Sequence, residues 1–98
     1  MPPLPVNFNT RSLRDYRRAH RYYSRIDAQL AKRFSDTIDA ALVAIGAAPE
    51  RRSQPVPNVH KYVVGDFPYL IFYRVLPTQV RILRFVHGKQ QHPYWRQT

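Results

Sequence analysis

The spacing of apolar residues changes period along the chain, and each period predicts a different element. Over residues 4–9 apolar and polar residues alternate, which predicts a short first strand. Pro5 favours an edge position for this strand, because proline cannot donate to a ladder. The spacing then changes to steps of three and four, which predicts an amphipathic helix near 11–24. Asn9 or Thr10 is expected to cap that helix.

A second helix is predicted near 27–46. Residues 24–27 resemble a capping box with Asp at the last position, so Ser24 is expected to open this helix. Gly46 is expected to end it in the left-handed conformation, and Pro49 limits any continuation. Its apolar stripe consists of Leu30, Phe34, Ile38, Ala41, Leu42 and Ile45. The two helices are expected to form an antiparallel hairpin whose apolar stripes face a sheet.

The second half of the chain is predicted to supply that sheet. Residues 47–58 contain three prolines and are predicted as a loop, whereas 59–64 are predicted as a strand that ends at a Gly-Asp turn signal. Residues 69–88 carry the strongest strand signal, two runs rich in β-branched and aromatic residues. Pro77 suits the first corner of a turn over 76–79, so these two runs are predicted to form a hairpin.

Placing Leu76 opposite Gln79 divides the side chains of this hairpin between two faces. The face expected under the helices collects Ile71, Tyr73, Val75, Val80, Ile82 and Val86, with Arg84 at its edge. The other face collects Leu70, Phe72, Arg74, Arg81, Leu83, Phe85 and His87. In this register Arg74 and Arg81 are cross-strand neighbours, which is unfavourable unless an anion lies between them. We therefore expect an acidic partner to cover this second face, and the alternative is a solvated arginine pair.

These elements predict one α+β domain over residues 1–98, in the order β-α-α-β-β-β. The helix hairpin is expected to pack on one face of a small, mainly antiparallel sheet. The absence of cysteine excludes disulfides and cysteine-based zinc sites, and His60 and His92 lack the spacing of metal ligands. We expect no cofactor. The chain has no apolar run of membrane-spanning length and no signal-peptide pattern at its start, so a cytoplasmic protein is expected.

The chain carries a formal charge of +10, almost entirely from arginine. Arginine favours bidentate contact with carboxylate or phosphate, so the charge indicates either a nucleic acid or an acidic protein segment as partner. One side of the first predicted helix presents Arg11, Arg14, Arg18, Arg21 and Arg25. The simpler interpretation is a solvated face, and the alternative is a track for phosphates.

Several short motifs, spread over about residues 6–95, resemble the RelE/ParE family of type II toxin–antitoxin toxins. The set is similar to the ParE-like, plasmid stabilisation branch in particular. The motifs are Tyr22-Tyr23, Ala31 with Phe34, Leu42 with Ile45 and Pro49, Phe67-Pro68-Tyr69, Tyr73-Arg74-Val75, Val80-Arg81-Ile82-Leu83, Val86-His87-Gly88 and Pro93-Tyr94-Trp95. The resemblance implies a growth-inhibiting toxin that is silenced by an acidic antitoxin from an adjacent gene.

Family members act on different targets, and the resemblance implies either DNA gyrase, for ParE-like members, or messenger RNA on the ribosome, for RelE-like members. Two positions where RelE-like ribonucleases carry arginine read Leu70 and Gln90 here, which favours a toxin without chemistry of its own. The alternative is an endoribonuclease that uses Arg74, Arg81, His87 and Lys89. A third possibility is an inactive relative that only binds an acidic partner. Besides the residues of the second sheet face, His92, Tyr94 and Trp95 are expected to contact the target or the antitoxin.

Overall fold

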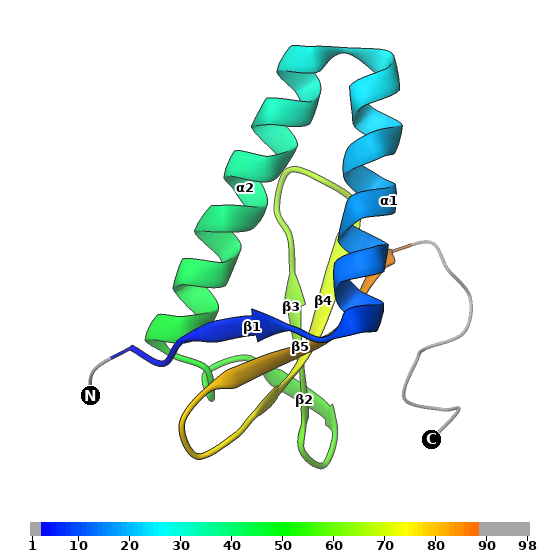
Figure 1. The fold of residues 1–98 in the computed structure, drawn as a ribbon. Helices are drawn as coiled ribbons and strands as arrows, with labels where there is room; N and C mark the ends of the chain where they lie inside the picture. The colour runs from blue at the N-terminus through cyan, green and yellow to red at the C-terminus, as the bar shows by residue number, and fades with distance from the viewer. Residues whose placement is uncertain (1–2, 89–98) are drawn as a thin grey trace.

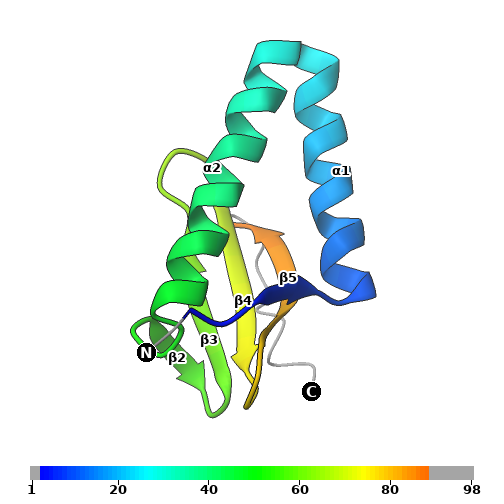
Figure 2. The same cartoon turned by 60° about the vertical axis from the view of Figure 1, so that its left-hand side comes forward.

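The computed structural model describes residues 3–88, which form two helices against a five-stranded sheet. The elements are β1 (Val6–Phe8), α1 (Thr10–Ile26), α2 (Ala28–Ala47), β2 (Ser53–Val56), β3 (Val59–Val63), β4 (Tyr69–Val75) and β5 (Val80–His87). The sheet order is β1-β5-β4-β3-β2, with β1 parallel to β5 and all other neighbours antiparallel. The helices form a hairpin that covers one face of the sheet (Figures 1 and 2). The predicted α+β class is confirmed.

The helices form where the periodicity predicts them, but two of their predicted ends are wrong. The Asn9 side chain accepts from Ser12 N–H and caps α1 as expected, whereas Ser24 lies inside α1 and donates to the His20 carbonyl. Asp27 caps α2 instead, because the chain becomes extended only at that residue. Gly46 is a buried residue within α2 with no positive φ. A Cβ at Gly46 would lie 2.7 Å from the Leu4 carbonyl oxygen, so close approach of the backbone explains this glycine.

Residues 47–58 are not entirely a loop, and this part of the prediction is wrong. The strand β2 pairs with β3 and forms the outer edge of the sheet, so the element order has one strand more than predicted. Pro55 lies in β2, where the edge position tolerates a missing donor. The sequence patterning missed β2 because its residues are mostly exposed and show no apolar alternation.

The central hairpin of β4 and β5 follows the predicted register near its turn at residues 76–79 and departs from it farther from that turn. Leu76 N–H donates to the Gln79 carbonyl, and Arg74 lies directly opposite Arg81 as predicted. The next pair away from the turn is Tyr73 opposite Ile82, but the pair after it is Phe72 opposite Arg84. Leu83 is therefore an extra residue on β5, which forms a bulge. Such a bulge reverses the alternation of the residues that follow it, and here it exchanges the faces of Phe85, Val86 and His87.

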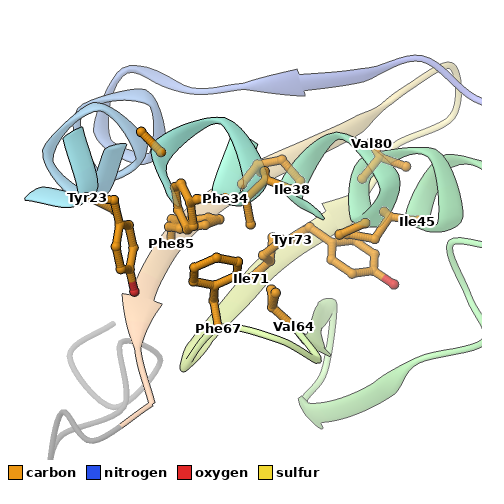
Figure 3. Close-up of a cluster of buried hydrophobic side chains, with 14 residues drawn as sticks. Tyr23, Phe34, Ile38, Ile45, Val64, Phe67, Ile71, Tyr73, Val80 and Phe85 are labelled. Carbon is orange, nitrogen blue, oxygen red and sulfur yellow. The ribbon is translucent and has the colours of Figure 1, made fainter. Parts of the chain in front are cut away.

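The core lies between the helix hairpin and the sheet, and aromatic rings make up much of it (Figure 3). The ring of Phe34 on α2 is fully buried and lies 4.8 Å from the ring of Tyr23 and 5.1 Å from that of Phe67, centroid to centroid. Phe85 of β5 belongs to this cluster at 3% exposure. The helix hairpin therefore seals one face of the sheet with close-packed apolar side chains.

Candidate functional site

The open face of the sheet, the face turned away from the helices, carries the pair of cations that the register predicted. Arg74 on β4 and Arg81 on β5 lie directly opposite each other, and both are exposed. Two guanidinium groups held this way repel each other and concentrate positive potential between the strands. This arrangement suits a carboxylate or phosphate bound between them.

Apolar side chains border the two arginines. Leu70 of β4 and Leu83 of the bulge are partly exposed and lie outside the helix-side core cluster. Phe72, in contrast, is only 1% exposed, so its ring offers a partner little area although it also lies outside that cluster. The open face therefore combines these two arginines with two accessible leucines, and β3 adds Lys61 opposite Phe72 and the exposed Val63 opposite Leu70. An acidic segment with apolar side chains would match it.

The bulge moves three predicted residues to the other face, and these assignments are wrong. Phe85, expected on the open face, packs in the core 5.9 Å from the ring of Tyr16. Val86, expected in the core, lies opposite Leu70 on the open face. His87, also expected on the open face, lies opposite Tyr69 with the two rings 5.4 Å apart, on the side of the helices. The structure therefore separates His87 from Arg74 and Arg81 by the thickness of the sheet.

The remaining predicted site residues lie outside the described part of the chain. These are Lys89, Gln90, His92, Tyr94 and Trp95. Within residues 3–88 no three His, Asp or Glu side chains come close enough to share a metal ion. Neither helix in that range has the length and apolarity needed to cross a membrane.

A hollow that the sequence did not predict lies between α1 and the C-terminal end of β5. It has a volume of about 250 Å³ and is lined by Asp15, Arg18, Ala19, Tyr22, Tyr69, Arg84, Phe85 and His87. One oxygen of Asp15 accepts from Arg84 Nε at 2.8 Å and from the Phe85 N–H at 3.0 Å. This carboxylate thus holds the bulged strand against α1. The one signal in the sequence is that Asp15 is the only acid in a helix of six arginines.

At the other end of the sheet a second polar cluster ties the segment after α2 to the core. The Tyr73 hydroxyl donates to the Pro49 carbonyl at 2.6 Å, and the His60 ring stacks on Tyr73 at 5.2 Å. His60 Nδ1 lies 3.2 Å from the Arg52 carbonyl oxygen. Burial raises the pKa of Tyr73 to about 12, although the nearby Arg52 opposes this rise. Tyr73 therefore stays a neutral donor, which indicates a structural role for this cluster.

Comparison with known proteins agrees with the resemblance seen in the motifs. Residues 6–92 match the family described as the ParE toxin of the type II toxin–antitoxin system parDE. The chain is 30% identical over 88 residues to Toxin RelE1 of Caulobacter vibrioides, which covers 88% of this chain and 95% of that protein.

Solved structures that share the fold include a chain of a ParDE system and a RelE toxin. The chromosomal ParDE toxin–antitoxin system from P. aeruginosa contains a chain that matches with a TM-score of 0.76 at 16% identity, over 88% of this chain and 97% of that one. The isolated E. coli RelE toxin matches with a TM-score of 0.61 at 14% identity, over 96% and 94% of the two chains. With the family match over residues 6–92, the chain belongs to the ParE toxin family, and it is a type II toxin of the RelE/ParE superfamily.

Proposed function

We propose that this chain is a ParE-like toxin that inhibits an essential protein target without catalysis, with DNA gyrase as the first candidate. An acidic antitoxin from an adjacent gene neutralises it. One observation carries the non-catalytic assignment: His87 lies on the helix side of the sheet, whereas Arg74 and Arg81 lie on the open side. Gyrase and the ribosome, the two targets that the family suggests, are cytoplasmic, so we place the action of the toxin there.

The separation matters because metal-free RNA cleavage needs its groups around one phosphate. A base must reach the 2′-hydroxyl while cations stabilise the charge that develops on the phosphorus oxygens. Arg74 and Arg81 can supply the cations, but His87 cannot reach the same phosphate across the sheet. Leu70, where RelE-like ribonucleases carry arginine, supplies neither charge nor proton. The described residues of the open face are thus suited to binding rather than to acid–base chemistry.

We place the antitoxin on the open face. An acidic segment can pair its carboxylates with Arg74 and Arg81 while its apolar side chains cover Leu70 and Leu83. Replacing both arginines by alanine is expected to weaken antitoxin binding by ten-fold or more, and the loss should shrink at high salt because exposed charges are screened. The matched control is Arg33→Ala/Arg51→Ala, which removes the same charge from exposed positions elsewhere. Equal losses in both variants would overturn this placement.

The target is tested with purified toxin in two parallel assays. One measures DNA supercoiling by gyrase, and the other measures cleavage of messenger RNA on programmed ribosomes. We expect supercoiling to stop while the message stays intact. Cleaved message with unaffected gyrase would establish the ribonuclease alternative instead. Normal growth on expression without antitoxin would identify an inactive relative that only binds its partner.

A further inference from the structure

We propose that a row of arginines on α1 binds the phosphate backbone of duplex DNA, as a second surface distinct from the open face of the sheet. The arginine row consists of Arg11, Arg14, Arg18, Arg21 and Arg25, with Arg17 beside it. This inference does not depend on the identity of the toxin's target, because it concerns a different part of the molecule.

The row is straight and exposed along most of the helix. Its members follow one another at steps of three, four, three and four residues, and all of them are exposed. Such steps keep side chains on one line along a helix, and the line from first to last is about 21 Å long. Four of the six arginines line a hollow of about 370 Å³ on the helix surface, which is lined by Thr10, Leu13, Arg14, Arg17, Arg18 and Arg21.

The charge of the row is not balanced within the described chain. Asp15 is the only acid in α1, and its carboxylate already binds Arg84 and the Phe85 N–H. The two ion pairs found in residues 3–88 involve Lys32 and Arg84, and neither includes a member of the row. Neighbouring like charges at three- and four-residue steps destabilise a helix. An anionic partner along the row would remove this repulsion, which a plain solvated face leaves in place.

The chemistry of the row suits a phosphate backbone better than an acidic protein segment. The open face of the sheet places leucines between and beside its arginines, whereas the row has the half-buried Leu13 on one flank and the exposed Tyr22 on the other. Affinity for such a surface comes from charge alone, as in sequence-independent contacts with DNA phosphates. Proteins that bind single strands interleave several aromatic side chains for base stacking, whereas Tyr22 is the one exposed tyrosine of α1. Double-stranded DNA is therefore the favoured partner.

The row stays accessible when a partner covers the open face. The side of α1 that faces the core buries Ser12, Ala19 and Tyr23, and the arginines lie on the opposite side of the helix. In Figure 2 α1 lies on one side of the sheet, and the open face is turned to the other side. The side of α1 opposite its buried residues is therefore turned away from the sheet. The free toxin and the toxin–antitoxin complex are therefore both expected to bind DNA through α1.

The test measures binding of the full chain to a 20-base-pair duplex of mixed sequence by fluorescence anisotropy, between 50 and 200 mM salt. The variant Arg14→Ala/Arg18→Ala/Arg21→Ala removes three cations that would neutralise phosphates, and alanine at exposed helix positions preserves folding. The slope of log affinity against log salt falls by about 0.9 for each phosphate that is no longer neutralised, so a decrease of about 2–3 is expected. At 50 mM salt the affinity should fall ten-fold or more.

The control removes three charges elsewhere, in Lys32→Ala/Arg33→Ala/Arg51→Ala, all at exposed positions. Its slope is expected to stay within about 0.5 of the parent's, because diffuse attraction does not neutralise particular phosphates. Equal decreases in the two triple variants would overturn the proposal, as would no decrease in either. Polyglutamate or single-stranded RNA that bound more tightly than the duplex, with the same dependence on the row, would also overturn it. Gyrase inhibition is scored separately, so failure here leaves the proposed target untouched.

Discussion

The two faces of the β4–β5 hairpin are built from alternate residues of the same strands, yet they differ in almost every physical respect. On the helix side, Tyr73 and Phe85 are buried in the core, and the Phe85 ring contacts Tyr16 of α1 and Phe34 of α2. On the open side, Arg74 and Arg81 face each other in solvent. The comparison teaches that one face supplies the stability of the toxin while the other can be charged and destabilising, because it is shaped for a partner.

The largest loss of stability should come from truncating Phe34, the α2 residue that packs on the helix-side face of the hairpin. This fully buried ring contacts the rings of Tyr23, Phe67 and Phe85, with centroids 4.8–6.0 Å away. Phe34→Ala should lower the free energy of unfolding by about 3–5 kcal/mol, because it reduces apolar burial and leaves a cavity behind. Leu70→Ala on the open face should cost about 1 kcal/mol or less. Urea titration measures the free energy of unfolding of both variants. Similar losses would contradict the conclusion that the helix-side face supplies most of the stability.

The attachment of the bulged strand β5 to α1 depends on Asp15. Asp15→Ala removes the partner of Arg84 Nε and of the Phe85 N–H, so it should cost about 2–3 kcal/mol of unfolding free energy. Asp36→Ala is the control, because its pair with Lys32 is exposed to solvent and should contribute far less to the free energy of unfolding. Urea titrations that gave equal losses would mean that Asp15 does not hold the bulged strand.

The helix-side face should also show alkaline sensitivity through Tyr73. Burial raises the pKa of this phenol to about 12, so the folded protein keeps the proton that the unfolded chain loses near pH 10. Stability from this group is thus complete below pH 10 and is lost as the pH rises toward 12, by about 2 kcal/mol. Urea titrations at pH 9 and pH 11.5 measure this effect. Between these two pH values the parent protein should lose more unfolding free energy than the variant Tyr73→Phe, which has no hydroxyl to ionise. An identical pH dependence in the variant would refute the assignment.

The smallest effect, and the most diagnostic for the open face, concerns Arg74 and Arg81. Either single change to alanine should stabilise the free toxin by a few tenths of a kcal/mol, because it removes a cross-strand repulsion. The gain should vanish near 1 M salt, where charges are screened. Thermal unfolding at low and high salt measures it. Destabilisation at low salt would show that the two guanidinium groups have a structural rather than a binding role.

Much of the fold followed from local patterns in the sequence. The periodicity of 11–24 and 27–46 predicted both helices, and the Pro77 turn predicted that Arg74 lies opposite Arg81. These features depend on neighbours a few residues apart, since the period of apolar residues and the turn chemistry act at short range. The cationic pair, which is the centre of the candidate site, was therefore predictable.

Only the tertiary structure decided the bulge at Leu83, the sides taken by Phe85 and His87, and the extra strand β2. The bulge accompanies contacts between residues far apart in the chain, since Asp15 binds the β5 backbone across 70 positions. Residues 69–88 are apolar on both predicted faces, so their pattern does not exclude a one-residue shift. A bulge costs little locally and is selected by the packing it allows, which is why sequence patterning could not place His87 on the helix side.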